Sequence, residues 1–122
     1  MLELVPGDIV WTQPNFTVGS EQAGRRPALV VAGSEYLTRV ERLAVVVPIT
    51  TVDRGWPNHI VIEGGGLARA SWAMSEQLQT ISRRRIFGLA GRVEPQTVMA
   101  VRKWIAAFLD LPSGRPGAPW AS

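Results

Sequence analysis

The stretch GSEQAGRRPALVV (residues 19–31) joins a polar, glycine-containing loop to an unbroken apolar run. Apolar residues at consecutive positions are typical of a strand that is covered on both faces. Pro27 favours an extended conformation in the residue before it, so Arg26 should project from the start of this strand with little backbone freedom. We therefore expect a charged side chain held where a flexible loop meets a rigid sheet.

Most of the remaining chain up to residue 93 is also predicted to be β. Short apolar or alternating runs predict strands at residues 7–12, 27–32, 43–50, 59–63, 70–74, 77–81 and 86–93. Pro48 interrupts the third run and cannot donate a backbone hydrogen bond, so we expect it at a sheet edge or a bulge. The spacing of these strands predicts a small, strongly bent antiparallel sheet or barrel.

The period of the apolar residues changes after Glu94, where Pro95 suits the first position of a helix. Up to residue 110, apolar residues recur at helical spacing at Val98, Val101, Ile105 and either Phe108 or Leu109. We expect an amphipathic C-terminal helix that packs on the sheet, which makes the fold class mainly β (α+β). One domain should span residues 1–111, and the Pro-, Gly- and Ser-rich residues 112–122 should form a flexible tail.

The composition favours an anionic partner. The 122-residue chain has a formal net charge of +3, and twelve of its thirteen basic residues are arginine. Arginine matches phosphate with a planar fork, which suits a nucleic acid or an acidic protein, although a codon bias toward arginine would give the same composition.

The composition also narrows the class of protein. The chain has no cysteine and a single histidine, so we expect no metal and no cofactor. No apolar run reaches the roughly 18 residues of a membrane span, and no signal-peptide pattern is present. We expect a cytoplasmic protein with no membrane partner.

Three groups of side chains could carry chemistry. The first is the pair Arg25 and Arg26, because a fixed guanidinium can hold a phosphate by two hydrogen bonds and stabilise developing charge. An arginine before proline can equally be an ordinary surface residue that pairs with a nearby acid such as Glu21. The sequence leaves both readings open.

The second group lies in VPITTVDRGWP (residues 47–57), where Thr50 and Thr51 would offer hydroxyls at the rim of the core. Trp56 offers a flat face on which a base can stack. The alternative is that these residues simply end a strand and close the mouth of the barrel.

The third group lies in SEQLQTISRRR (residues 75–85). Glu76, Gln77 and Gln79 could read the edge of a base, and the three arginines could neutralise backbone phosphates. Such a run of charge is also typical of a solvated turn. His59 is interpreted as a half-exposed strand residue.

Taken in order, these motifs resemble the MazF/PemK-like toxins of type II toxin–antitoxin systems over about residues 5–111. The likeness rests on PGDIVW, GSEQAGRRPALVV, VVPITT, RGWPNHIVI and SEQLQTISRRRI, followed by the helix. It implies an SH3-like barrel, a two-fold homodimer, and a metal-independent endoribonuclease that cuts single-stranded RNA at short sequences in mRNA, tRNA or rRNA. It also implies growth inhibition and a cognate MazE-like antitoxin, whose acidic, partly disordered tail covers the RNA site.

The resemblance assigns catalysis to Arg26, directly before proline, and to Thr50, at the end of the third predicted strand. The 2′-hydroxyl of RNA can attack its own 3′-phosphate, so the enzyme need only align the groups, provide a proton path and stabilise the phosphorane. Arginine is effectively always protonated, which favours phosphorane stabilisation over a role as base. The products would carry 2′,3′-cyclic phosphate and 5′-hydroxyl ends.

Further residues are candidates for binding RNA. The resemblance places four of them where family members contact or position RNA: Phe16, Glu21, Glu76 and Gln77. Four others come from the same motifs: Gln22, Arg25, Thr51 and Trp56. Arg25, Trp56 and the tail are not constant in the family, so the target sequence does not carry over.

Two other functions compete with RNA cleavage. CcdB-like toxins share a related barrel but trap DNA gyrase, lack the loop arginine before proline, and depend on a tryptophan near the end of the terminal helix. Neither Trp104 nor Trp120 lies in that setting. A catalytically inactive RNA-binding module would bind RNA without cutting it.

Overall fold

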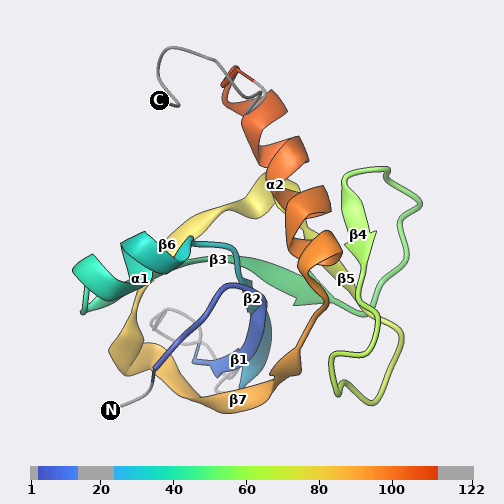
Figure 1. The fold of residues 1–122 in the computed structure, drawn as a ribbon. Helices are drawn as coiled ribbons and strands as arrows, with labels where there is room; N and C mark the ends of the chain where they lie inside the picture. The colour runs from blue at the N-terminus through green and yellow to red at the C-terminus, as the bar shows by residue number, and fades with distance from the viewer. Residues whose placement is uncertain (1–2, 14–23, 113–122) are drawn as a thin grey trace, which may run out of the picture.

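The computed structural model describes residues 3–13 and 24–112, and within them the fold is an antiparallel sheet with a C-terminal helix (Figure 1). The strands are β1 (Asp8–Thr12), β2 (Arg26–Val30), β3 (Leu43–Thr50), β4 (His59–Val61), β5 (Trp72–Met74), β6 (Gln79–Ser82) and β7 (Ile86–Arg92). The helices are α1 (Ser34–Arg39) and α2 (Pro95–Phe108), with single 3₁₀ turns η1 (Ser75–Gln77) and η2 (Arg83–Arg85). The predicted fold class is confirmed.

The strands enclose a small barrel. The pairing order is β4-β5-β3-β2-β1-β7, and β6 pairs separately with β3. Because β6 runs through η2 directly into β7, the chain itself closes the ring β1-β2-β3-β6-β7 (Figure 1). β4 and β5 extend the sheet beyond this ring, beside α2.

Strands β1, β2 and β3 are apolar on both faces because each face meets a different core. One cluster fills the barrel and includes Val10, Ala28, Val30, Val46 and Ile81. The other lies between the outer face and α2 and includes Ile9, Leu29, Val47, Val98 and Val101. Burying such a side chain fully contributes about 1.5–3 kcal/mol, so the two clusters fix the barrel wall from both sides.

The sequence predicted Pro48 at a sheet edge or a bulge. In the structure it lies in the central strand β3. The Val45 carbonyl accepts a hydrogen bond from Val31, so by alternation the backbone groups of Pro48 face away from β2. On that side β3 pairs with β6 up to Val46 and with β5 from Ile49. The proline therefore lies in the gap between two partners, where its missing N–H costs no ladder hydrogen bond.

Several element boundaries differ from the prediction. Strands β4 and β5 are shorter than the runs at residues 59–63 and 70–74, and α2 ends at Phe108. Helix α1 was not predicted because its six residues bury only Leu37, too little to show a period. The loop at residues 14–23 and the predicted tail from residue 113 onward lie outside the described residues.

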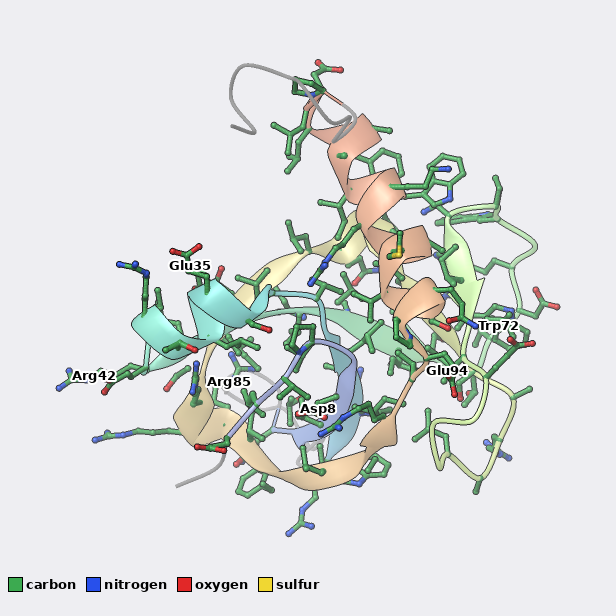
Figure 2. The ribbon with its side chains drawn as sticks, viewed as in Figure 1. Asp8, Glu35, Arg42, Trp72, Arg85 and Glu94 are labelled. Carbon is green, nitrogen blue, oxygen red and sulfur yellow. The ribbon has the colours of Figure 1, made fainter. Side chains whose placement is uncertain are left out.

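No helix in the described part of the chain is long and apolar enough to cross a bilayer. Figure 2 shows Glu35 and Arg42 pointing away from the barrel, whereas Asp8 lies within the fold. Asp8 is fully buried, and its carboxylate accepts hydrogen bonds from the Val5 N–H (2.9 Å) and Arg92 Nε (2.8 Å). This pairing ties the chain before β1 to the end of β7.

Strand β7 also touches the loop before β5 through bare backbone. A Cβ added at Gly91 would overlap the carbonyl oxygen of Gly65, whereas a Cβ at Gly88 in the same strand would meet no atom within 4 Å. Gly91 therefore has backbone packed against it, whereas Gly88 of the same strand has open space.

We therefore predict that Gly91→Ala lowers the free energy of unfolding by about 2 kcal/mol or more, because the backbone facing it cannot move aside as a flexible side chain can. Gly88→Ala is the matched control and should change it by less than about 0.5 kcal/mol. Urea unfolding followed by circular dichroism measures both. Equal effects of the two substitutions would contradict the close approach at Gly91.

Candidate active site

A cavity of about 440 Å³ opens where β1, β2 and β3 meet η1. Its polar lining consists of Thr12, Arg26, Thr50, Arg54, Gln77, Gln79 and Arg85. Three of these side chains are cationic, and no carboxylate of the described residues lines the cavity. The site therefore has a positive potential that suits an anionic ligand.

Strand register aligns the two predicted catalytic residues. In β1 and β2, Thr12 lies opposite Arg26. In β2 and β3, Ala28 lies opposite Pro48, and the same register continued by two residues brings Arg26 level with Thr50. Opposed residues of antiparallel strands point to the same face. Thr12, Arg26 and Thr50 thus form a row across three strands, and all three line the cavity.

The backbone of Arg26 is fixed while its side chain stays exposed. The Thr12 hydroxyl donates a hydrogen bond of 3.0 Å to the Arg26 carbonyl, and Pro27 pairs with Trp11 in the next register position. Among the described residues no carboxylate forms an ion pair with Arg26. Its guanidinium thus lines the cavity without a described acidic partner.

Thr50 ends β3 as a half-buried residue whose hydroxyl is already oriented. Its Oγ1 accepts a hydrogen bond of 3.1 Å from the backbone N–H of Val52. This contact uses an oxygen lone pair and leaves the hydroxyl proton to be donated. Thr50 can therefore act as a hydrogen-bond donor to an oxyanion in the cavity.

Arg54 was not named in the sequence analysis, although it lies in the motif at residues 47–57. It lines the cavity, and its guanidinium carbon lies 5.9 Å from the centre of the Trp56 ring. A basic residue four positions after Thr50 and two before an aromatic residue was the available signal. Arg85 joins it from η2, where its Nε donates to the Gln13 carbonyl at 2.9 Å.

The three arginines of η2 do not act alike. Arg83 donates hydrogen bonds to the carbonyls of Leu37, Val40 and Leu43, so it joins the end of α1 to β3. Its guanidinium is thus occupied by backbone carbonyls, and the neutralisation of phosphate by Arg83 stays a prediction. Arg85 alone of the three lines the cavity.

Glu76 lies next to the cavity rather than in it, and it anchors η1. Its carboxylate accepts hydrogen bonds from Asn58 Nδ2 (2.7 Å) and from His59 Nε2 (3.1 Å to each oxygen). His59 was expected to be half-exposed, but it is buried between this carboxylate and Trp56, whose ring centre lies 4.7 Å away. The anchor leaves the next residue, Gln77, lining the cavity.

These contacts shift the pKa of the Glu76 carboxyl group. Partial burial raises the pKa of its carboxyl group, but hydrogen bonds from His59 and from backbone, together with attraction to His59, outweigh that effect. The pKa of Glu76 therefore lies below its ordinary value of 4.5.

The remaining residues that the sequence predicted for the site fall into two groups. Arg25, Thr51 and Trp56 are exposed and do not line the cavity. Phe16, Glu21 and Gln22 lie outside the described residues. The structure therefore brings together Arg26, Thr50 and Gln77 of the predicted set.

Comparison with known proteins agrees with this site. The family model of PemK-like, MazF-like toxins of type II toxin–antitoxin systems matches residues 5–109. The chain belongs to this family. It is 33% identical over 104 residues to the endoribonuclease toxin MazF of Escherichia coli K12, a match that covers 84% of this chain and 91% of that protein. The chain is thus a MazF-like endoribonuclease toxin, as the sequence motifs implied.

Solved structures confirm the MazF-like fold. A crystal structure of MazF from Deinococcus radiodurans is similar with a TM-score of 0.75 at 23% identity, covering 91% of this chain and 100% of that one. A MazE–MazF structure from the same organism reaches 0.78 at 22% identity, covering 92% and 100%. An endoribonuclease with its cognate antitoxin from a mycobacterial species reaches 0.70 at 19% identity, covering 93% and 99%.

We predict that Glu76→Gln removes an acid-sensitive part of the stability. A carboxyl whose pKa is lowered on folding stabilises the fold fully above its unfolded value and loses that contribution as pH falls through the folded value. The difference in free energy of unfolding between the wild type and Glu76→Gln should therefore be largest near pH 7 and shrink toward about pH 3.

Urea unfolding at several pH values measures this difference. Glu35→Gln is the control, because Glu35 is an exposed carboxylate whose ion pair among the described residues is with Arg39 (3.0 Å), so it should show little change at any pH. A cost of Glu76→Gln that is the same at neutral and acid pH would contradict the prediction.

Proposed function

We propose that this toxin cleaves single-stranded RNA in the cavity without a metal ion. The 2′-oxygen of a ribose bonds to the adjacent phosphorus while the bond to the 5′-oxygen breaks, and the 2′-hydroxyl proton ends on the 5′-oxygen. The products carry a 2′,3′-cyclic phosphate and a 5′-hydroxyl. The observation that carries this proposal is that Arg26 and Thr50, from neighbouring strands, line one cavity, where no described carboxylate pairs with Arg26 and the Thr50 hydroxyl can still donate.

The cavity residues have different proposed roles, which follow from their side-chain chemistry. The guanidinium of Arg26 stabilises the charge that builds on the phosphorane, and Thr50 donates a hydrogen bond to one of its oxygens. Arg54 and Arg85 attract the flanking phosphates. Gln77 and Gln79 offer both donors and acceptors, which suits reading the edges of unpaired bases.

The attacking group belongs to the substrate, which is why this set of residues is sufficient. An enzyme that only aligns an internal nucleophile and stabilises its transition state needs no nucleophilic side chain of its own. The rate should be modest, which suits a toxin that cuts a few sites in mRNA, tRNA or rRNA rather than digesting RNA completely. Cutting such transcripts would inhibit translation and growth.

We also propose a cognate antitoxin as partner. Two of the similar solved structures are complexes with an antitoxin. A cavity with three arginines and no carboxylate among its described lining residues is complementary to an acidic peptide segment. We further propose that the toxin works as a two-fold homodimer in the cytoplasm, where its RNA substrate would be found.

We predict that Arg26→Ala and Thr50→Ala each lower the cleavage rate at least about a hundredfold, the usual effect of losing one donor to a developing oxyanion. A long defined RNA is incubated with each protein in EDTA, and the cut ends are mapped. Arg39→Ala is the control, because Arg39 is an exposed arginine outside the cavity and should leave the rate unchanged.

The same assay separates the competing functions because it contains no gyrase. RNA that stays intact with the wild type would favour a gyrase poison, and RNA that is bound but not cut would favour an inactive binding module. Wild-type rates from both Arg26→Ala and Thr50→Ala would show that the site is assigned to the wrong residues.

A further prediction concerns Arg54, which we place on a phosphate beside the scissile one. Arg54→Ala should raise KM with little change in kcat, and it should reduce the slope of log affinity against log salt by about 0.7, the value of one phosphate contact on a single strand. Arg69→Ala, an exposed arginine that does not line the cavity, should leave the slope unchanged. Binding titrations over a range of salt concentrations measure both.

A further inference from the structure

A bulge in β7 lies at the cavity end of the barrel. Trp11 lies opposite Gly88 and Thr12 lies opposite Ile86, with a shift of register between these two pairs. Phe87 is therefore the extra residue of the bulge. Bulges interrupt the ladder, redirect a side chain and are frequent beside active sites.

The position of this bulge connects it with the catalytic row. Thr12 pairs with Ile86 on one side and with Arg26 on the other, so Phe87 comes one residue after the position that continues the row into β7. Arg25, the neighbour of Arg26, places its guanidinium carbon 5.1 Å from the centre of the Phe87 ring. The ring itself is 49% exposed.

Within residues 3–13 and 24–112, no aromatic side chain gives the cavity a stacking surface of its own. None of its described lining residues is aromatic. Two pairs of an arginine and an aromatic residue each adjoin a cavity-lining residue: Arg54, itself in the lining, contacts Trp56, and Arg25, next to Arg26 in the chain, contacts Phe87 of β7. In the strand order β3-β2-β1-β7 these pairs lie on either side of the strand that begins with Arg26.

We propose that Phe87 and Arg25 form a stacking subsite for the base of a nucleotide that flanks the scissile phosphate. The proposal rests on the proposed function, since it takes single-stranded RNA as the ligand. Unpaired bases stack on aromatic rings and on guanidinium planes, largely independently of sequence. Arg25 holds the ring by a cation–π contact and adds a positive charge beside the strand.

The test uses a short RNA that contains a mapped cleavage site, with 2′-deoxyribose at the cut so that it binds without reacting. 2-Aminopurine is placed in turn at each position around the cut, because its fluorescence falls when it stacks. With the wild type we expect quenching at one flanking position. Phe87→Ala should abolish that quenching, and Phe87→Trp should retain it.

Cleavage of the unmodified RNA gives a second readout. Phe87→Ala should lower kcat/KM about tenfold, mainly through KM, as expected for the loss of one base–aromatic stack. Leu89→Ala is the matched control, because Leu89 is a comparably exposed apolar residue of the same strand, lying opposite Val10. It should cut RNA as the wild type does.

The outcomes separate this inference from the proposed function. Wild-type quenching and cleavage by Phe87→Ala, together with loss of cleavage by Arg26→Ala, would overturn the subsite and leave the RNA-cutting function in place. An equal loss in Leu89→Ala would also overturn it, because the effect would then belong to the exposed apolar surface of β7 in general. A wild-type protein that cuts no RNA would overturn both.

Discussion

The register of three antiparallel strands is the constraint on which the site depends. Thr12 opposite Arg26, and Arg26 level with Thr50, put a hydroxyl, a guanidinium and a second hydroxyl on one face. A slip of one residue between two of these strands would move one member of the row to the opposite face. The two cores of the barrel wall disfavour this slip, because it would exchange members such as Val30 and Leu29 between the clusters and disrupt the packing of both.

Among the described residues, two arginines at the cavity are held by a backbone carbonyl and an aromatic ring, where carboxylates would usually hold them. Arg85 donates to a main-chain carbonyl, and Arg54 lies against an aromatic ring. None of these contacts neutralises the charge. The positive potential is therefore kept for a ligand, and an anion that binds there should stabilise the folded protein by mass action.

The sequence predicted the features that depend on neighbouring residues. Strand β3 has the predicted bounds, and Arg26 is fixed at a strand start as its proline implied. Features that depend on distant contacts were missed. Pro48 is central because two different strands flank it, and His59 is buried because Glu76 and Trp56 close over it. Arg83 and Arg85, two positions apart, differ because the turn of η2 directs one to α1 and the other to the cavity.

The structure separates the groups assigned to chemistry from those assigned to recognition. The row of Thr12, Arg26 and Thr50, to which we assign the chemistry, is part of the barrel wall, and its geometry follows from ladder pairing and two apolar cores. Gln77 is held instead by the Glu76–His59 contact in η1, and Phe87 by a bulge that breaks the ladder of β7. Substitutions at such positions change side chains at the cavity or its rim without altering the register of β1, β2 and β3. A barrel of this kind can therefore acquire a new target sequence while its phosphate chemistry stays the same.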